Sequence, residues 1–208
     1  MKLYDAMTPN SLRVHVFLAE KGIEVDREKI DVLGGGTRTA DFLAINSLGE
    51  LPVLETDDGH ILTESVAISR YLEELYPNPP LMGESAFDQA RIEMWNRRME
   101  QQIFGPIGNV GRHTLPFFAD KVEQLANFAE SQSRLFDSNW AWLDSELSDD
   151  RPFVAGDAFS IADITGMAAL FVCDILQKTL PDNLSFANRW ARTMKARESF
   201  ASRMVKAA

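Results

Sequence analysis

The stretch from Ile45 to Ile68, INSLGELPVLETDDGHILTESVAI, constrains most strongly how this chain can fold. Leu51-Pro52 leads into a short apolar run, and the turn signal Asp57-Asp58-Gly59 separates that run from a second one. Asp-Gly between two apolar runs favours a primed hairpin turn, because glycine accepts a positive φ. A proline at the first residue of a strand donates no hydrogen bond to a neighbouring strand. The stretch therefore predicts a hairpin with an exposed backbone edge at Leu51-Pro52.

A helix is expected directly after this hairpin. Thr63-Glu64-Ser65 opens a run whose apolar residues recur at helical spacing. A hydroxyl and a carboxylate at a helix start form a favourable site for a zwitterion. The plainer interpretation is that Thr63-Glu64-Ser65 only caps the helix. Beside the exposed edge at Leu51-Pro52, the charged helix tip instead suits a small peptide ligand.

Composition and charge narrow the function classes. The chain has 208 residues, 45% of them hydrophobic, which is enough for one large domain or two small ones. The net charge of −10, with no basic stripe, argues against nucleic acid as a partner. The sequence holds no apolar run near the roughly 20 residues that span a bilayer, so no membrane association is expected. The first ten residues do not resemble a signal peptide.

Cysteine and histidine usage indicates a reducing compartment and no metal. Cys173 is the single cysteine and cannot form an internal disulfide, which fits a cytoplasmic location. The three histidines show no spacing typical of metal ligands. Cys173 lies in an apolar helical run, so we interpret it as a packed core residue rather than a redox centre.

The first part of the chain reads as an α/β unit. The patterns predict, in order, a strand at 2–5, a helix from Ser11 to Lys21, a strand within 23–32, a short helix within 39–45, the hairpin, and the helix after it. Gly34-Gly35-Gly36 is interpreted as a loop, because a phosphate-binding loop would end in Gly-Lys-Ser/Thr. The proline-rich stretch 76–83 is a linker. We therefore divide the chain into domains 1–83 and 84–208.

The second domain is predicted to be all helical. The patterns predict a helix over 85–104 interrupted at Gly105-Pro106, a second over 117–147, a third over 160–176, and one or two more over 183–206. Ser160 and Asp163 have the spacing of a capping box, in which Asp163 reaches back to the Ser160 N–H. We assign this pair to folding, because it starts a buried helix whose first N–H groups need partners.

The combined pattern resembles a known family. NSLGELPVL, LTESVAISRYLEE, the proline linker and AGDAFSIADI together resemble the cytosolic glutathione S-transferase superfamily over essentially the full chain. The resemblance implies a thioredoxin-like N-terminal domain followed by an all-helical bundle, with glutathione as co-substrate. It also implies a homodimer.

The resemblance also implies which residues bind glutathione. Leu51 would offer its N–H and C=O to the cysteinyl part, before a cis peptide to Pro52. Ser65 would bind the γ-glutamyl carboxylate through its hydroxyl and N–H, and Glu64 would hold the amino group. Where the family commonly has lysine, this chain has Glu50, so another group must hold the glycine carboxylate. Arg38 and Thr37 are the candidates, and a solvated surface charge is an equally good interpretation of Arg38.

Several residues are candidates for the contact with the glutathione thiol. Alignment of the first helix places Thr8 at the serine of the serine-type families. Thr8-Pro9-Asn10 also resembles a bacterial and fungal branch in which a threonine and an asparagine bracket the sulfur. Ser11 is an alternative hydroxyl or the N-cap of the helix, and Tyr4 is the last choice. Donors at a helix N-terminus lower the pKa of a bound thiol, whose ordinary value is near 8.5.

The second substrate is expected against the helix after the linker, between the domains. An adaptable apolar pocket there would suit many electrophiles. Its predicted lining is Met99, Ile103, Phe104 and His113, each of which could equally be ordinary helix packing.

Three functions are compatible with the sequence. The first is conjugation of glutathione, bound as thiolate, to a small apolar electrophile. The second, suggested by Thr8-Pro9-Asn10, is glutathione-dependent disulfide reduction. The third is a transferase-like binding module without catalysis. Leu51-Pro52 with Glu64-Ser65 argues against the third, because a scaffold needs no γ-glutamyl clamp.

Overall fold

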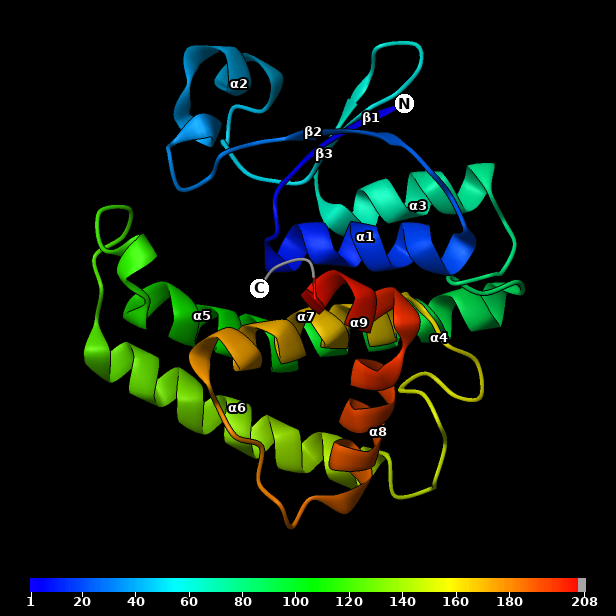
Figure 1. Cartoon of the computed structure of the whole chain (residues 1–208). Coiled ribbons are helices and arrows are strands. Elements are labelled where there is room, and N and C mark those ends of the chain that lie inside the picture. Colours follow the sequence, from blue (N-terminus) through cyan, green and yellow to red (C-terminus); the bar gives the residue numbers. More distant parts are fainter. Residues whose placement is uncertain (206–208) are drawn as a thin grey trace. The chain divides into compact units, whose positions relative to one another are not determined.

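The computed structural model describes residues 1–205 of the chain and the side chains of residues 1–202. These residues form two compact units. The first comprises Met1–Leu81 together with the last described residues from Ser202 onward, and the second comprises Met82–Ala201. Figure 1 shows that the strands belong to the first unit and the long helices to the second.

The first unit is built on a four-stranded mixed sheet. Its elements are β1 (Lys2–Asp5), α1 (Pro9–Lys21), β2 (Asp26–Lys29), the 3₁₀ turn η1 (Gly36–Arg38), α2 (Ala40–Ile45), β3 (Val53–Glu55), β4 (Ile61–Leu62) and α3 (Ser65–Leu75). The strand order is β2-β1-β3-β4, in which β1 and β2 are parallel and the other pairs antiparallel. The predicted order of strands and helices is confirmed.

The core of this unit lies between the sheet and two helices. Leu3 pairs with Leu54 across β1 and β3, and both side chains are fully buried. Helices α1 and α3 pack side by side (Figure 1) and contribute buried apolar residues such as Phe17 and Ile68. Because β1 is central, the turns at its C-terminal edge carry the start of α1 and the entry to β3 to the same region.

The predicted hairpin is present, but the predicted primed turn is wrong. Within 57–59 the backbone φ is positive at Gly59 alone, at 82°. The Gly59 N–H donates to the Thr56 carbonyl at 3.0 Å, which gives a turn through Asp57-Asp58 followed by one left-handed glycine. The Thr56 hydroxyl explains this longer loop, because it accepts from the His60 N–H at 2.9 Å and donates to Asp58.

The linker is fastened to the first unit by a buried lysine. Lys21 Nζ donates to the carbonyls of Tyr76 and Pro79 at 2.6 and 2.7 Å, and pairs with Glu73 at 2.7 Å. The other Glu73 oxygen accepts from the Leu81 N–H at 2.9 Å. A fully buried ammonium with three oxygen partners meets the condition under which a buried charge is tolerated.

The second unit is helical, as predicted, with two corrections to the helix boundaries. Its elements are α4 (Ala86–Arg98), the π-helical segment η2 (Met99–Phe104), α5 (Gly105–Thr114), the 3₁₀ turn η3 (Pro116–Phe118), α6 (Ala126–Glu146), α7 (Ile161–Leu176), α8 (Ser185–Ala196) and α9 (Glu198–Val205), whose last residues group with the first unit. The helix predicted over 117–147 begins at Ala126, because Pro116–Phe118 forms a separate turn.

The second correction concerns Gly105-Pro106, where we predicted an interruption. The chain stays helical there and instead widens to π-type bonding over Met99–Phe104. Pro106 has no N–H for the Gln102 carbonyl, four residues earlier. The Asn139 side chain on α6 donates to that carbonyl at 2.8 Å. A partner from another helix thus replaces the missing bond, and the helix continues.

Helix α7 is the centre of the second unit. Its capping box is confirmed, because Asp163 accepts from the Ser160 N–H at 3.1 Å. Asp163 also accepts from the Val154 N–H at 3.0 Å and from Trp190 Nε1 at 2.9 Å. Gly166 gives the Trp190 ring room, since a Cβ there would lie 2.4 Å from it. None of the described helices combines the length and apolarity that crossing a membrane would require.

Candidate functional site

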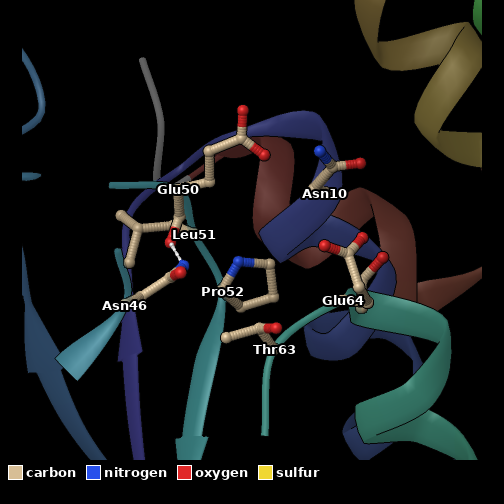
Figure 2. A pocket seen from close by; sticks show the side chains of 8 residues that line it. Asn10, Asn46, Glu50, Leu51, Pro52, Thr63 and Glu64 are labelled. Atoms are coloured by element: carbon tan, nitrogen blue, oxygen red, sulfur yellow. Dashed lines mark hydrogen bonds between the residues drawn. The ribbon is translucent and has the colours of Figure 1, made fainter. Parts of the chain in front are cut away.

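A pocket in the first unit is lined by one residue of α1, one residue of α3 and the loops before β3 and α3. Figure 2 shows it from close by. It is lined by Asn10 at the start of α1, by the approach to β3 and by the start of α3; the full lining is Asn10, Asn46, Glu50, Leu51, Pro52, Thr63, Glu64 and Ser65. The structure thus brings together the two motifs of the Ile45–Ile68 stretch and one residue from the first helix of the chain.

Leu51-Pro52 forms one wall of the pocket. The peptide bond between them is cis, which confirms that expectation. Among the described residues, the Leu51 N–H and C=O have no backbone hydrogen-bond partner. The Leu51 side chain points the other way and is buried in a cluster with Tyr4 and Val53. The anchored side chain therefore holds an open peptide edge against the pocket.

A tight loop before Leu51 positions this edge. Asn46 Nδ2 donates to the Glu50 carbonyl at 2.9 Å, and Asn46 Oδ1 accepts from the Leu48 N–H at 3.2 Å. Gly49 has a φ of 62°, and a Cβ there would lie 2.7 Å from the Thr37 carbonyl. Only glycine combines that φ with that close approach at low cost. Asn46 and Gly49 therefore fix the entry to Leu51.

The start of α3 forms the opposite wall. Glu64 is exposed and has a φ of 64°, a conformation that costs a non-glycine residue about 1–3 kcal/mol. Ser65 follows as the first helical residue and is 5% exposed. The first N–H groups of any helix lack intrahelical acceptors, so this helix start presents donors at the pocket.

The three candidate thiol donors, Thr8, Asn10 and Ser11, lie at the start of α1 but in different surroundings. The helix begins at Pro9, two residues before the predicted start, because Thr8 is the N-cap and proline suits the first helical position. The Thr8 hydroxyl accepts from the Ser11 N–H at 3.2 Å and lies 3.1 Å from the Ser11 hydroxyl. Ser11 is fully buried and lies within the helix, so Thr8 is the N-cap in place of the Ser11 that we considered. Of these three residues, Asn10 alone lines the pocket.

The Asn10 side chain is held by a neighbour on the same helix. Arg13 Nη2 donates to Asn10 Oδ1 at 2.9 Å. In the view of Figure 2 the Asn10 amide nitrogen lies on the side toward Glu50. The pocket therefore receives an amide donor beside the positive end of the α1 dipole.

Comparison with known proteins assigns the family. Residues 8–75 match the family model described as glutathione S-transferase, N-terminal domain. The chain is 34% identical over 205 residues to glutathione S-transferase 2 of Saccharomyces cerevisiae, and the match covers 96% of this chain and 87% of that protein. The chain belongs to the glutathione S-transferase family.

Solved structures agree with this assignment over nearly all of this sequence. A glutathione S-transferase domain-containing protein from Marinobacter aquaeolei is 35% identical, with a TM-score of 0.90 and coverage of 96% of this chain and 100% of that chain. Gtt2 from Saccharomyces cerevisiae is 31% identical, with a TM-score of 0.90 and coverage of 98% and 100%. The predicted fold class, a thioredoxin-like unit followed by a helical one, is confirmed, and the relatives show a transferase enzyme.

Three residues predicted to contact glutathione do not line the pocket: Arg38, Thr37 and Tyr4. Arg38 does not line it, and its Nη1 donates to the Leu48 carbonyl at 3.0 Å. Thr37 is buried behind Gly49. Tyr4, the last choice for the thiol, donates its hydroxyl to Glu55 at 2.7 Å and sits in the core. The hydrogen bonds of Arg38 and Tyr4 keep their side chains away from the pocket, and the spacing of residues in the sequence does not reveal these bonds.

The sequence patterns predict no ligand contact for three of the lining residues: Asn46, Glu50 and Thr63. Asn46 carried a usable signal, because asparagine three residues before glycine is typical of a side-chain-stabilised turn. Glu50 differs from the lysine common in the family, and its place directly before Leu51 puts it in the pocket lining. The sequence pattern places Thr63 only in the cap of the following helix.

The residues predicted for a second substrate lie in the helical unit of the transferase. Met99 and Ile103 have no exposed surface, whereas Phe104 and His113 are half-buried. His113 Nδ1 accepts from the Leu125 N–H at 3.2 Å, and its ring meets Phe128 edge-on at 4.9 Å. Their part in substrate binding stays a prediction. No three His, Cys, Asp or Glu side chains of the described residues are grouped to hold a metal ion.

Proposed function

We propose that the pocket binds glutathione as its thiolate and that the enzyme transfers it to a small apolar electrophile. The observation that carries the proposal is the meeting of Asn10, Leu51 and Ser65 in one pocket. These residues offer a side-chain amide, an open peptide edge and a helix start, and each matches one chemical group of the ligand.

The cysteinyl part pairs with Leu51. An extended peptide beside an unpaired backbone edge gains main-chain hydrogen bonds, as in strand addition. Both the N–H and the C=O of Leu51 are open for such a pair among the described residues. The cysteinyl peptide groups would donate to that C=O and accept from that N–H.

The γ-glutamyl part binds at the start of α3. Its carboxylate accepts from the Ser65 N–H and hydroxyl, where the helix dipole favours negative charge. Its ammonium faces the exposed carboxylate of Glu64. The strained Glu64 backbone fits this role, because strain of this kind persists where the surrounding structure holds a residue for function.

The thiol is then placed at the start of α1. The Asn10 Nδ2 group donates to the sulfur, and the helix N-terminus further favours the thiolate. The thiolate attacks an electrophilic carbon, a C–S bond forms, and the leaving group departs with the electron pair of the broken bond. No protein base is needed once the thiol pKa has fallen below the working pH.

A matched pair of variants tests the thiol donor. Asn10→Asp keeps an oxygen for Arg13 but replaces the amide donor with a negative acceptor, so kcat for an aryl halide should fall about 10²-fold or more. Thr8→Val removes the N-cap and should cost about 1 kcal/mol of stability with a smaller effect on kcat. Unchanged turnover in Asn10→Asp, with a large loss in Thr8→Val that is absent in Thr8→Ser, would move the assignment to Thr8.

Disulfide reduction is the second candidate, favoured by Thr8-Pro9-Asn10 at the start of α1. There the bound thiolate attacks the glutathione sulfur of a mixed disulfide, expels the other thiolate and forms glutathione disulfide. Cys173 takes no part, because it is buried in the helical unit and burial raises its pKa to about 12. Turnover of a small mixed disulfide that exceeds that of every aryl halide tested would favour this candidate.

We also propose that the enzyme is a homodimer, as the family resemblance implies. Light scattering on the eluting protein in gel filtration tests this directly, since one chain has a mass of 23.4 kDa. A single species at the mass of one chain, across a hundredfold dilution series, would contradict it.

A further inference from the structure

The pocket lining is negatively charged and does not complement the two carboxylates of free glutathione. Its lining holds two carboxylates, Glu50 and Glu64, and none of its described lining residues is Lys, Arg or His. Glutathione brings two carboxylates and one ammonium besides its thiol. One carboxylate and the ammonium are accounted for at α3 under the proposed function. The second carboxylate, on the glycine, has no cation among the described lining residues.

In the proposed binding orientation, the glycine residue of glutathione extends toward Glu50. In the view of Figure 2, Glu64 lies to the right of Pro52, and Glu50 lies above Pro52 and to its left. A ligand whose γ-glutamyl end sits at Glu64 and whose cysteinyl part pairs with Leu51 must therefore extend its third residue to the Glu50 side. The free carboxylate of that residue would meet a like charge.

No described residue neutralises Glu50. It forms no ion pair with another described residue, and its side chain is exposed. Arg38, the predicted partner of the glycine carboxylate, is outside the lining and donates to the Leu48 carbonyl. Two like charges a few ångströms apart near a protein surface repel by an amount equivalent to several-fold to about tenfold in affinity, and salt weakens the effect.

We propose that this pocket selects thiol tripeptides of the glutathione type whose glycine carboxylate is masked, and that Glu50 is the residue that sets this preference. A glycine amide removes the repulsion, and an amide that carries a terminal amine adds an attraction to Glu50. The preferred substrate class is thus a glutathione amide with a cationic extension. The inference rests on the proposed function, because it assumes that the tripeptide binds in the orientation described above.

The experiment compares three thiols by isothermal titration calorimetry on the full chain. They are glutathione, its glycine amide, and its N-(3-aminopropyl) amide. The wild-type protein should bind the aminopropyl amide about tenfold more tightly than glutathione, with the plain amide between them. The spread should narrow as the salt concentration rises from about 0.01 to 1 M.

Three variants assign the effect. Glu50→Gln should bring the dissociation constants of the three thiols close together, and Glu50→Lys should reverse the order in favour of glutathione. Glu24→Lys is the matched control, because Glu24 is exposed, lies outside the lining and follows the C-terminal end of α1, whereas Asn10 lies at its start. Glu24→Lys changes the net charge of the protein by the same amount as Glu50→Lys. It should keep the wild-type order of affinities for the three thiols.

The outcomes separate this inference from the proposed function. Wild-type binding of glutathione as tightly as, or more tightly than, both amides would overturn the inference and leave the glutathione site intact. The wild-type order retained in Glu50→Gln and Glu50→Lys would also overturn it. No measurable binding of any of the three thiols would remove the proposed function and the inference together.

Discussion

The Arg13 guanidinium donates to Asn10 Oδ1 at 2.9 Å, and this contact determines which way the Asn10 amide faces. A guanidinium has donors and no acceptor, so the amide atom that meets it must be oxygen. The amide nitrogen is then left for the pocket. The two residues are three positions apart on α1, the spacing at which helical side chains meet. Arg13 is 4% exposed, so water screens this charge-assisted bond poorly.

Arg13 should therefore act as a positioning residue for the thiolate donor. Arg13→Met keeps the length and apolar contacts of the side chain but frees the Asn10 amide to rotate. We expect kcat/KM to fall about tenfold. Because the bound thiol loses part of its stabilisation, the rise of rate with pH should move to higher pH. The measurement is a pH–rate profile with an aryl halide.

A double variant separates positioning from general damage to the fold. Arg13→Met added to Asn10→Ala should cost little beyond Asn10→Ala alone, because the amide to be positioned is already gone. Additive losses in the double variant, or a lower rate with an unshifted pH profile, would show that Arg13 acts through the fold and not through Asn10.

The positive φ of Glu64 predicts that the backbone at this position lowers the stability of the fold while its carboxylate contributes to glutathione binding. Glu64→Gly and Glu64→Ala both remove the carboxylate, but glycine alone adopts a φ of 64° without strain. The glycine variant should be more stable than the alanine variant by about 1 kcal/mol, and both should lose glutathione affinity. Urea unfolding and calorimetry measure the two effects. Equal stability of the two variants would mean that the backbone relaxes at this position.

Local signals made the two motifs of the Ile45–Ile68 stretch predictable from the sequence. Leu51-Pro52, the hairpin and Glu64-Ser65 lie within one short stretch, so spacing alone places them together. Thr8-Pro9 also indicates the observed start of α1, because it has the pattern of an N-cap followed by proline at the first helical position. A helix that begins at Pro9 has Asn10 in its first turn. The Thr8 hydroxyl then caps the helix by accepting from the Ser11 N–H.

Long-range contacts explain what the sequence could not show. The role of Arg38 depends on the Leu48 carbonyl, which only the folded loop brings within reach. The apolar pattern predicts a helix from Phe117, but Phe117 and Phe118 lie in a 3₁₀ turn and α6 begins at Ala126. At Pro106 the local rule predicts a break, and the helix continues because Asn139, 33 residues further along the chain, replaces the lost donor.

The Asn139 contact predicts a coupling with Pro106. Asn139→Ala should destabilise the protein by about 0.5–1 kcal/mol, because the Gln102 carbonyl loses its donor at an exposed position that water can reach. In a Pro106→Ala background the backbone regains an N–H at position 106, so the same change should cost clearly less. Urea unfolding of the four proteins in this cycle gives the coupling free energy. A cost of Asn139→Ala that is the same in both backgrounds would disprove the compensation.

The buried capping carboxylate predicts how stability changes with pH. Burial raises the pKa of Asp163 to about 6, although Val154, Trp190 and Ser160 all donate to the carboxylate. The pKa of aspartate in an unfolded chain is about 3.9. Between these two values the native protein keeps a proton that the unfolded chain has lost. This group's contribution to the free energy of unfolding therefore falls as the pH rises from about 4 to about 6, by up to about 3 kcal/mol, and is constant above that range.

The difference between the wild-type protein and Asp163→Asn isolates this contribution, because other carboxylates titrate equally in both. The introduced amide would retain an oxygen for Val154 and Trp190 but would lose the acceptor for the Ser160 N–H, so the variant should be less stable by about 1–3 kcal/mol. Urea unfolding at pH 4, 5, 6 and 7 should show that the wild-type advantage shrinks as the pH rises. A carboxyl-carbon NMR titration of the wild-type protein checks the same pKa without a variant. Parallel stability curves, together with an Asp163 carboxyl that titrates near 4, would contradict the prediction.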